Sequence, residues 1–476
     1  MDARSLVETV LSGKNRPFGV RLWDGTELPP LHGSSVPVLL VANERGAAAF
    51  GPPPTEEKLS EAFLAGDIEL EGDLVDFIER AAGWSGPDSL PATVLAAGLV
   101  AEVGARAGGL LRSAARHTIA RDDASVRHHY DVGNDFYRLF LDEQMVYSCA
   151  YWTEGATRLD LAQVAKLELI CRKLGLGPGQ RFLDVGCGWG ALIAHATRVH
   201  GVLATGISLS DAQLEVAQGR MRSVLPAGTP PDLRHQDYRR LPENERWDAM
   251  ASVGMMEHVG REHLDRYFTS LARHLAPGGL LLNHAIAETG SASTTIPWLP
   301  RTHGGFIQQE IFPDSDLPPL DLVTAAAQRS GFEVLDVEAF RPFYVRTLLE
   351  WLGRLERRFA EAVQLVGNRR ARAWRLYLAS TAITFKTGRT TVAQMLLQKR
   401  EGGRPRVLDK AGWYRDLIAG AERAPQRRTA RSEPTVSSQV PALAPSGSGI
   451  RRSQRSKSPS RSPGRISRKT PRSRRT

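Results

Sequence analysis

The sequence contains little cysteine and no long apolar run. Its 476 residues include three cysteines, at positions 149, 171 and 187, which are too few and too scattered for a disulfide framework or a cysteine-based zinc site. We therefore expect a reducing cytoplasm and no metal site. No uninterrupted apolar segment reaches the roughly 20 residues that span a bilayer, and the first residues lack a signal pattern. We expect any membrane contact to be peripheral.

Acidic residues are nearly absent from positions 424–476, which hold fourteen lysines and arginines against one acid, Glu433. This tail carries +13 and the whole chain +10, so the remainder is at −3 and is not a basic platform for nucleic acid. The tail consists largely of Ser, Arg and Pro with almost nothing to bury, and we expect it to be disordered. It is either a solvated appendage or a segment that binds anionic lipid or nucleic acid non-specifically.

Residues 1–115 are predicted to form a small amino-terminal α+β domain. Strand-like pieces lie near 18–22 and 36–41, and helical patterns near 59–65 and 74–82 flank an acidic segment. This region contains no catalytic constellation. We expect a catalytic domain over 116–423.

The catalytic region alternates between strand-like and helical patterns, which predicts an α/β fold with a mostly parallel, doubly wound sheet. Helices are expected to begin near positions 191, 210 and 261, with arginine-rich helices over 345–380. The segment 290–317, rich in Pro and Gly, is predicted to cover an active site. Strands are predicted near 181–185, 202–207, 233–236, 247–253 and 279–286, and a late edge strand near 391–397.

The first of these strands ends in three alternating glycines, Gly186, Gly188 and Gly190. Glycines at a strand-to-helix turn let a ligand lie against bare backbone at the carboxyl edge of a sheet. The spacing is G-x-G-x-G, with Asp184 before it, and differs from the G-x-G-x-x-G of dinucleotide folds. The next strand ends in Ser208 where a pyridine-nucleotide protein usually has an acid, so NAD is disfavoured.

Polar side chains also follow the other strands. Gln236 and Asp237 end the third strand, Glu257 follows the fourth, and His284 lies within the fifth. Because the carboxyl ends of parallel strands meet at one edge of a sheet, these groups are expected to converge beside the glycine turn.

With these motifs, residues 120–415 resemble the cyclopropane-fatty-acyl-phospholipid synthase family, which also contains the mycolic acid cyclopropane synthases. The resemblance implies a Rossmann-like class I methyltransferase fold. The amino-terminal unit resembles the extra domain of the phospholipid-acting bacterial members. The motifs that carry the resemblance are His129–Tyr137, Tyr147–Trp152, Leu183–Gly190, Gly206–Ser210 with Gln213, Met256–Gly260 and Tyr344–Leu348.

The resemblance implies a role for each matching residue. Contacts to S-adenosylmethionine are implied for Tyr147, Ser148, Asp184, Gly186, Cys187, Gly188, Gly190, Ser208, Gln213, Gln236 and Asp237. A bound bicarbonate is implied at Cys149, Glu257, His284, Ile286 through its backbone, and Tyr344. Cys149 has no positive neighbour that would activate its thiol, so we expect it to position the anion and not to act as a nucleophile.

The implied reaction explains why these groups are needed. A sulfonium methyl must be aligned with a weakly nucleophilic alkene, and a base must then remove a proton from the new methyl group. Aromatic faces could stabilise the cation, although packing is the simpler role. Those aromatic candidates are Tyr130, Phe136, Tyr137 and Tyr151.

Three questions about function and assembly stay open. A methyl- or methylene-branched acyl chain is the alternative product, because it needs the same cofactor and base. A nucleic-acid-binding protein that uses the basic tail is a more distant reading. A homodimer is compatible with the sequence, and the expected location is the inner face of the membrane.

Overall fold

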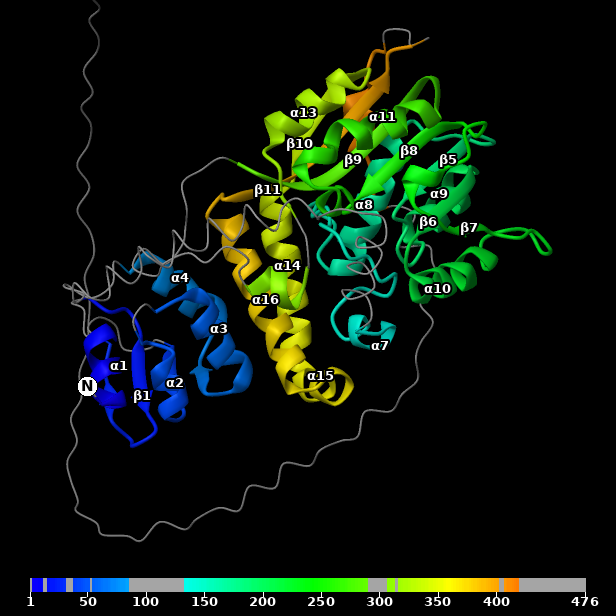
Figure 1. Cartoon of the computed structure of the whole chain (residues 1–476). Coiled ribbons are helices and arrows are strands. Elements are labelled where there is room, and N and C mark those ends of the chain that lie inside the picture. The colour runs from blue at the N-terminus through cyan, green and yellow to red at the C-terminus, as the bar shows by residue number, and fades with distance from the viewer. Residues whose placement is uncertain are drawn as a thin grey trace, which may run out of the picture. The chain divides into compact units, whose positions relative to one another are not determined.

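The structure is a computed structural model that describes residues 2–11, 15–30, 37–51, 54–84, 132–289, 306–312, 316–401 and 406–418. All of these belong to one compact unit, Met1–Ala424. They form a four-stranded sheet near the amino terminus and a seven-stranded sheet in the catalytic region (Figure 1). Among the helices of these ranges, none has the length and apolarity needed to cross a bilayer.

The large sheet has the strand order β10-β11-β9-β8-β5-β6-β7. Five neighbouring strands, from β9 to β7, are parallel, and β11 runs antiparallel to both β9 and β10. The doubly wound, mostly parallel sheet predicted from the sequence is therefore confirmed. The strands are β5 (Arg181–Val185), β6 (Leu203–Ser208), β7 (Asp232–His235), β8 (Trp247–Val253), β9 (Leu275–Glu288), β10 (Phe332–Ala339) and β11 (Thr390–Lys399).

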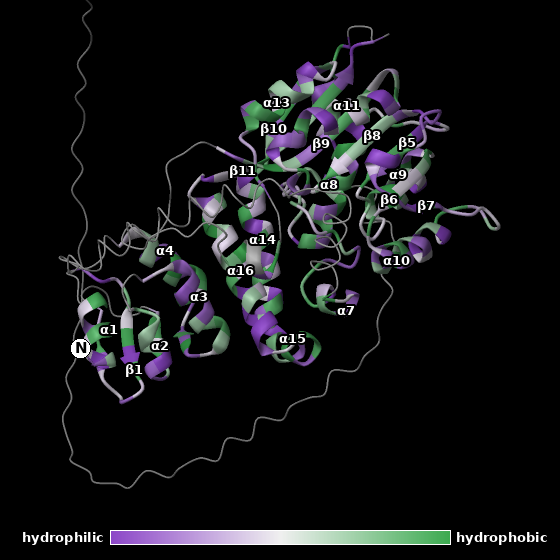
Figure 2. Cartoon of the chain, in the orientation of Figure 1, coloured by the Kyte–Doolittle hydropathy of each residue, from purple (hydrophilic) through white to green (hydrophobic). Residues whose placement is uncertain are grey.

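The central strands are apolar on both faces because both faces are covered. In β5, Phe182 packs into one hydrophobic cluster and its neighbour Leu183 into a second, as expected when side chains alternate between the faces of a buried strand. The helices that cover the sheet carry both hydrophilic and hydrophobic residues (Figure 2). Helices α8 (Leu159–Lys173) and α9 (Ala191–His200) contribute to the first cluster, and α11 (Leu264–His274) and α13 (Leu320–Arg329) to the second.

The predicted helix starts are confirmed. Ser210 caps α10 (Asp211–Arg222), and a short 3-10 turn, η3 (Arg261–His263), leads into α11. The arginine-rich region forms α14 (Arg341–Arg357), α15 (Phe359–Val366) and α16 (Asn368–Lys386). The remaining short elements of this region are α7 (Asn134–Tyr137), η1 (Tyr238–Arg240), η2 (Met256–His258), α12 (Phe306–Glu310) and α17 (Lys410–Trp413).

One strand prediction is wrong in its position. The segment predicted as a late edge strand is β11, which lies between β9 and β10 and is buried over nine of its ten residues. The edge strand at this end of the sheet is β10, which was not predicted because its pattern, with acids at positions 333, 336 and 338, lacks a continuous apolar run. Most of the predicted cover, 290–317, lies outside the described residues.

The amino-terminal region has its own sheet, ordered β2-β1-β3-β4. The predicted strands and helices are confirmed as β1, β3, α3 and α4, and the acidic segment contains the unpredicted strand β4. The elements are α1 (Ala3–Leu11), β1 (Gly19–Leu22), β2 (Glu27–Leu28), β3 (Val38–Val41), α2 (Glu44–Ala48), α3 (Glu56–Ala65), β4 (Ile68–Glu71) and α4 (Leu74–Gly83). Residues 85–131, including the predicted link and Tyr130, lie outside the described ranges, as do the predicted domain boundary and the tail.

Candidate functional site

The glycine turn between β5 and α9 is shaped by backbone conformation. Gly186, Gly188 and Gly190 have φ angles of 80°, 54° and 77°, which disfavour residues with a Cβ atom. A Cβ on Gly190 would lie 2.8 Å from the Cβ of Ala217. Gly190 therefore permits close contact between α9 and α10, whereas Gly186 and Gly188 form part of a cavity wall.

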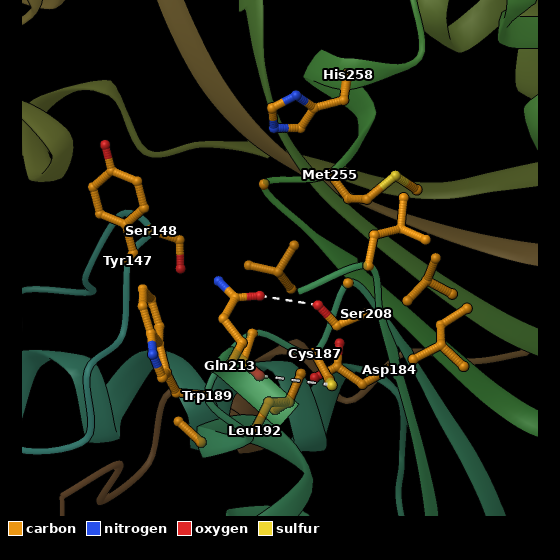
Figure 3. Close-up of a pocket in the computed structure, with 18 of the residues that line it drawn as sticks. Tyr147, Ser148, Asp184, Cys187, Trp189, Leu192, Ser208, Gln213, Met255 and His258 are labelled. Carbon is orange, nitrogen blue, oxygen red and sulfur yellow. Dashed lines mark hydrogen bonds between the residues drawn. The ribbon is translucent and has the colours of Figure 1, made fainter. Parts of the chain in front are cut away.

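A cavity of about 160 Å³ lies at this carboxyl edge of the sheet. Figure 3 shows Tyr147 and Trp189 on the side opposite Asp184 and Met255. Ten of the eleven residues predicted to contact the cofactor line this cavity, and Gly190 does not. The ten are Tyr147, Ser148, Asp184, Gly186, Cys187, Gly188, Ser208, Gln213, Gln236 and Asp237.

The ends of β6 and β7 hold their polar side chains in fixed positions. The Ser208 hydroxyl donates to Gln213 Oε1 at 3.0 Å (Figure 3), and it accepts from the backbone N–H of Ser210 at 3.2 Å. At the end of β7, the buried Asp237 carboxylate forms a two-point pair with Arg239, at 2.6 and 2.9 Å. A hydroxyl, an amide and a carboxylate are thus available for ribose and adenine.

Lys166 is a cavity residue that sequence reasoning missed. Its Nζ donates to Ser148 Oγ at 2.8 Å, and only 1% of the residue is exposed. Burial lowers the pKa of Lys166 to about 8, and burial raises the pKa of the Asp184 carboxyl to about 7, opposed by the Lys166 charge. The sequence signal was a single lysine within the apolar stretch of α8. Lys166 and Ser148 together form a polar part of the wall of the cavity that the glycine turn also lines.

A second buried group of polar side chains adjoins the cavity. Glu257, in η2, accepts a hydrogen bond at Oε1 from the backbone N–H of Ile286, at 2.8 Å. Its other oxygen, Oε2, is buried and has no hydrogen-bond partner among the described residues. Burial raises the pKa of Glu257 to about 7. The group connects to the cavity through Gly254, Met255 and His258, which line it.

His284 is the second member of this group. Gln394, its cross-strand neighbour on β11, has its amide Nε2 3.2 Å from His284 Nδ1. With the amide in this orientation Nδ1 accepts the hydrogen bond, which assigns the imidazole proton to Nε2. That Nε2 is buried without a partner in the part of the chain that the structure describes. Burial, reinforced by Lys166 and Lys173, lowers the pKa of His284 well below its usual value, which keeps the ring neutral.

Phe340 connects the remaining predicted anion-site residues. Its carbonyl accepts from Cys149 Sγ at 3.8 Å and from the backbone N–H of Tyr344 at 3.0 Å. Its ring lies edge-on to His284, with centroids 5.7 Å apart. Cys149 does have a positive neighbour, Lys166, contrary to the expectation from the sequence, but burial outweighs that charge and raises the pKa of the Cys149 thiol well above its usual value. This argues against a nucleophile. Neither Phe340 nor Gln394 was predicted, since both come from elements distant in the sequence.

The predicted aromatic residues differ in placement. Phe136 and Tyr137 are fully buried and pack on Trp374, and Tyr137 also contacts the cavity residue Trp189, with centroids 5.0 Å apart. Tyr151 packs against Phe340 and Phe343. Tyr137 is therefore connected to the cavity through Trp189.

Comparisons with known proteins agree with this architecture. Residues 117–395 match the family model described as mycolic acid cyclopropane synthetase. A probable fatty acid methyltransferase of Pseudomonas putida is 36% identical over 394 residues, covering 82% of this chain and 93% of the relative. The cyclopropane-fatty-acyl-phospholipid synthase of Escherichia coli K12 is 36% identical over 260 residues, covering 55% of this chain and 64% of that protein. The crystal structure of mycolic acid cyclopropane synthase CmaA1 with SAH and CTAB matches with a TM-score of 0.53 at 32% identity, covering 58% of this chain and 98% of that one.

Proposed function

The chain belongs to the mycolic acid cyclopropane synthetase family of S-adenosylmethionine-dependent methyltransferases, and we propose that it converts the cis double bond of an unsaturated phospholipid acyl chain into a cyclopropane ring. The observation that supports this proposal is a cavity lined by the glycine turn with two buried side chains, Glu257 and His284, beside it. Each of these side chains has one polar atom without a hydrogen-bond partner among the described residues. The cavity would bind the methyl donor, and the pair would hold a small anion that acts as the base.

The cavity residues fit the donor in three ways. The bare backbone at Gly186 and Gly188 admits a ligand at the sheet edge. Ser208 with Gln213 offers a hydroxyl and an amide for ribose, and Gln236 with Asp237 offers polar groups for adenine. Lys166 holds Ser148 in place on the opposite wall.

The atoms of Glu257 and His284 fit bicarbonate. A carboxylate oxygen that can accept and an imidazole N–H that can donate are both buried without partners among the described residues. This is the donor and acceptor pattern that HO–CO₂⁻ requires. Bicarbonate, when bound, supplies a base small enough to reach the new methyl group. The backbone N–H of Ile286 fixes Glu257, Gln394 fixes His284, and Cys149 and Tyr344 complete the wall through Phe340.

The chain's own residues then have distinct tasks. The cavity wall orients the sulfonium methyl toward the alkene π electrons, and its apolar lining excludes water that would capture the cation. The carbon–sulfur bond breaks as the methyl carbon bonds to one alkene carbon, leaving a cation on the other. Glu257 and His284 would hold the anion that supplies the base for one methyl proton, and the electron pair left on the methyl carbon would close the ring.

The substrate class, location and assembly are parts of the same proposal. We expect the enzyme to act at the inner face of the membrane as a peripheral protein, with the amino-terminal domain and the cover segment 290–317 at the lipid surface. We expect no specific nucleic-acid partner. Homodimerisation is compatible with this arrangement and can be measured by light scattering.

A second product is favoured by one observation. The Pseudomonas putida relative, which matches 82% of this chain, is described as a probable fatty acid methyltransferase. If a hydride first shifts from the methylated carbon to the neighbouring cationic carbon, the cation lies on the carbon that bears the new methyl group. Loss of a methyl proton then gives a methylene branch and, after reduction by another enzyme, a methyl branch. Both products need the same cofactor cavity.

One experiment separates these outcomes. The protein is expressed in a bacterium that lacks cyclopropane lipids, and the fatty acid methyl esters are analysed by mass spectrometry after growth with methyl-deuterated methionine. The labelled product is then hydrogenated under conditions that reduce alkenes. A product that resists hydrogenation supports cyclopropanation, whereas a product of the same mass that is reduced supports the methylene-branched alternative. Absence of label from acyl chains in cells that contain folded protein would reject both.

A further inference from the structure

A cluster of metal-binding side chains lies between α8 and α9, outside the cavity and the anion group. Cys171 Sγ and one ring nitrogen each of His195 and His200 lie within 4.8 Å of one another. Cys171 comes from the last turn and a half of α8, and both histidines come from α9. The sequence did not suggest this group because the two histidines lie 24 and 29 positions after the cysteine and only one member is a cysteine.

A shared carboxylate orients both imidazoles. Glu168 Oε2 lies 2.8 Å from His195 Nε2 and 3.0 Å from His200 Nε2, while Glu168 Oε1 accepts from Arg172 Nε at 2.7 Å. Histidines that bind a metal commonly donate their other ring N–H to a carboxylate, which fixes the tautomer and increases ligand basicity. With Nδ1 of each ring bound to a metal, Glu168 would be such a carboxylate for both rings, because it already pairs with both Nε2 atoms.

The second observation concerns His195 itself. Its side chain is 5% exposed, and its Nδ1 is buried without a hydrogen-bond partner within the described ranges. Because Nε2 is committed to Glu168, Nδ1 carries a free lone pair. An imidazole lone pair that is buried without a donor is costly in a folded protein. A bound cation would satisfy it.

We propose that Cys171, His195 and His200 bind a divalent transition-metal ion of the zinc type, with Glu168 as the outer-sphere carboxylate. A thiolate with two imidazoles selects borderline metals such as Zn²⁺ over Mg²⁺ or Ca²⁺. Water would fill the fourth position on the side of His200, whose side chain is 16% exposed. This site is independent of the proposed reaction.

Binding is balanced by one proton. A cysteine binds such a metal as the thiolate, so the Cys171 thiol must release its proton when the sulfur–metal bond forms. The bound ion would join α8, which carries the cavity residue Lys166, to α9, which begins at the glycine turn. The metal site would therefore stabilise the contact between α8 and α9 next to the glycine turn.

Cobalt is a suitable probe because Co²⁺ replaces Zn²⁺ and absorbs light. The full-length protein, without a histidine tag and dialysed against a chelator, is titrated with Co²⁺. We expect saturation at one ion per chain, a thiolate-to-cobalt charge-transfer band, tetrahedral d–d bands, and release of about one proton at neutral pH. Added Zn²⁺ should remove the bands.

Two variants locate the site, and one serves as control. Cys171→Ser should abolish the charge-transfer band, and His200→Gln, at the more exposed ligand, should weaken Co²⁺ binding by more than about tenfold. Cys187→Ser, which alters a buried cysteine outside the cluster, should keep the band. Circular dichroism and thermal unfolding establish that each variant is folded. Weak binding without a thiolate band, or a band that persists in folded Cys171→Ser, would overturn the proposal and leave a closed hydrogen-bond network around Glu168.

Discussion

Glu257 and His284 lie beside the cofactor cavity and not in its wall, so their removal should separate binding from turnover. We expect Glu257→Ala and His284→Ala to change S-adenosylmethionine affinity by less than about threefold, which corresponds to less than 1 kcal/mol. Turnover should fall by about 10² to 10⁴, the usual contribution of positioned acid–base chemistry. Calorimetry with the cofactor and transfer of labelled methyl groups to vesicles measure the two quantities.

The control for this separation is Asp237→Ala, since Asp237 lines the cavity beside Arg239. That variant should lose cofactor affinity first. If the Glu257 and His284 variants lose affinity as strongly as Asp237→Ala does, the anion site has been assigned to the wrong residues.

The raised pKa of Glu257 predicts how the free energy of unfolding depends on pH. Burial raises its pKa to about 7 from the 4.5 of a free side chain, so the folded state favours the protonated form. As pH rises from about 4.5 to 7, the unfolded chain loses this proton first, and folding is progressively penalised by up to about 3 kcal/mol. Glu257→Gln should remove this penalty. Urea unfolding at pH 5 and pH 8 should show a smaller loss of stability for the variant than for the parent. An identical loss in both proteins would mean that Glu257 is ionised in the folded state at low pH.

At the residue scale, the sequence could place polar groups at the sheet edge where they lie next to a motif. Gly186, Gly188, Ser208, Gln236 and Asp237 line one cavity because parallel strands bring their carboxyl ends to one edge. Lys166, Gln394 and Phe340 were missed because their contacts join distant elements: β11 supplies the partner of His284, and the start of α14 supplies the carbonyl for Cys149. Local patterns carry no information about such pairs.

At the scale of elements, the α9–α10 contact depends on Gly190. Its φ of 77° and the 2.8 Å approach to Ala217 mean that Gly190→Ala adds backbone strain and overlap. We expect a loss of about 1–3 kcal/mol in unfolding free energy, measured by urea denaturation. Because Gly190 does not line the cavity, cofactor affinity in the folded variant should change less than stability.

Gly219 provides the matched control within α10. It is exposed and adopts ordinary helical backbone, and a Cβ at this position would have open space around it. Gly219→Ala should stabilise the protein by up to about 1 kcal/mol. If both substitutions stabilise the protein, the two helices are not in the close contact described.

Element prediction succeeded for the parallel core and failed at its antiparallel end. The strands β5 and β8 at the centre of the sheet are short, mostly apolar runs, and burial on both faces produces that pattern. The strand β7, at the outer edge, is short and mostly polar. The strand β10 alternates acids with apolar residues because one face is partly solvated. The insertion of β11 between β9 and β10 is a matter of chain order, which local sequence does not encode.

At the scale of the whole described molecule, a buried arginine on α16 adds polar contacts to the shared apolar core between the amino-terminal region and the catalytic region. Arg372 is 5% exposed, and its guanidinium donates to the carbonyls of Phe63 at 2.6 Å and Ile68 at 2.9 Å, and to Glu69. It also lies over the Phe63 ring, 4.3 Å from the centroid. A buried guanidinium with this many acceptors fixes the end of α3 and the start of β4 against the catalytic region.

Arg372→Ala would leave these carbonyls and Glu69 without their donor. The expected cost is about 2 kcal/mol or more, because buried acceptors lose their partner. The loss of stability should be confined to the amino-terminal region, so hydrogen exchange measured by mass spectrometry should accelerate in α3 and β4 and stay unchanged in β5 and β8.

Arg369→Ala is the matched control, since Arg369 pairs with Glu61 and Glu310 near the surface, where ion pairs contribute at most about 1 kcal/mol. Arg372→Lys keeps the positive charge and loses the planar guanidinium that donates to several acceptors at once. Its hydrogen-exchange pattern should therefore resemble that of Arg372→Ala more than that of the parent. Equal exchange in the Arg372 and Arg369 variants would show that the amino-terminal sheet is held by its other contacts, and the proposed role of that domain in lipid docking would then need no rigid connection to the catalytic region.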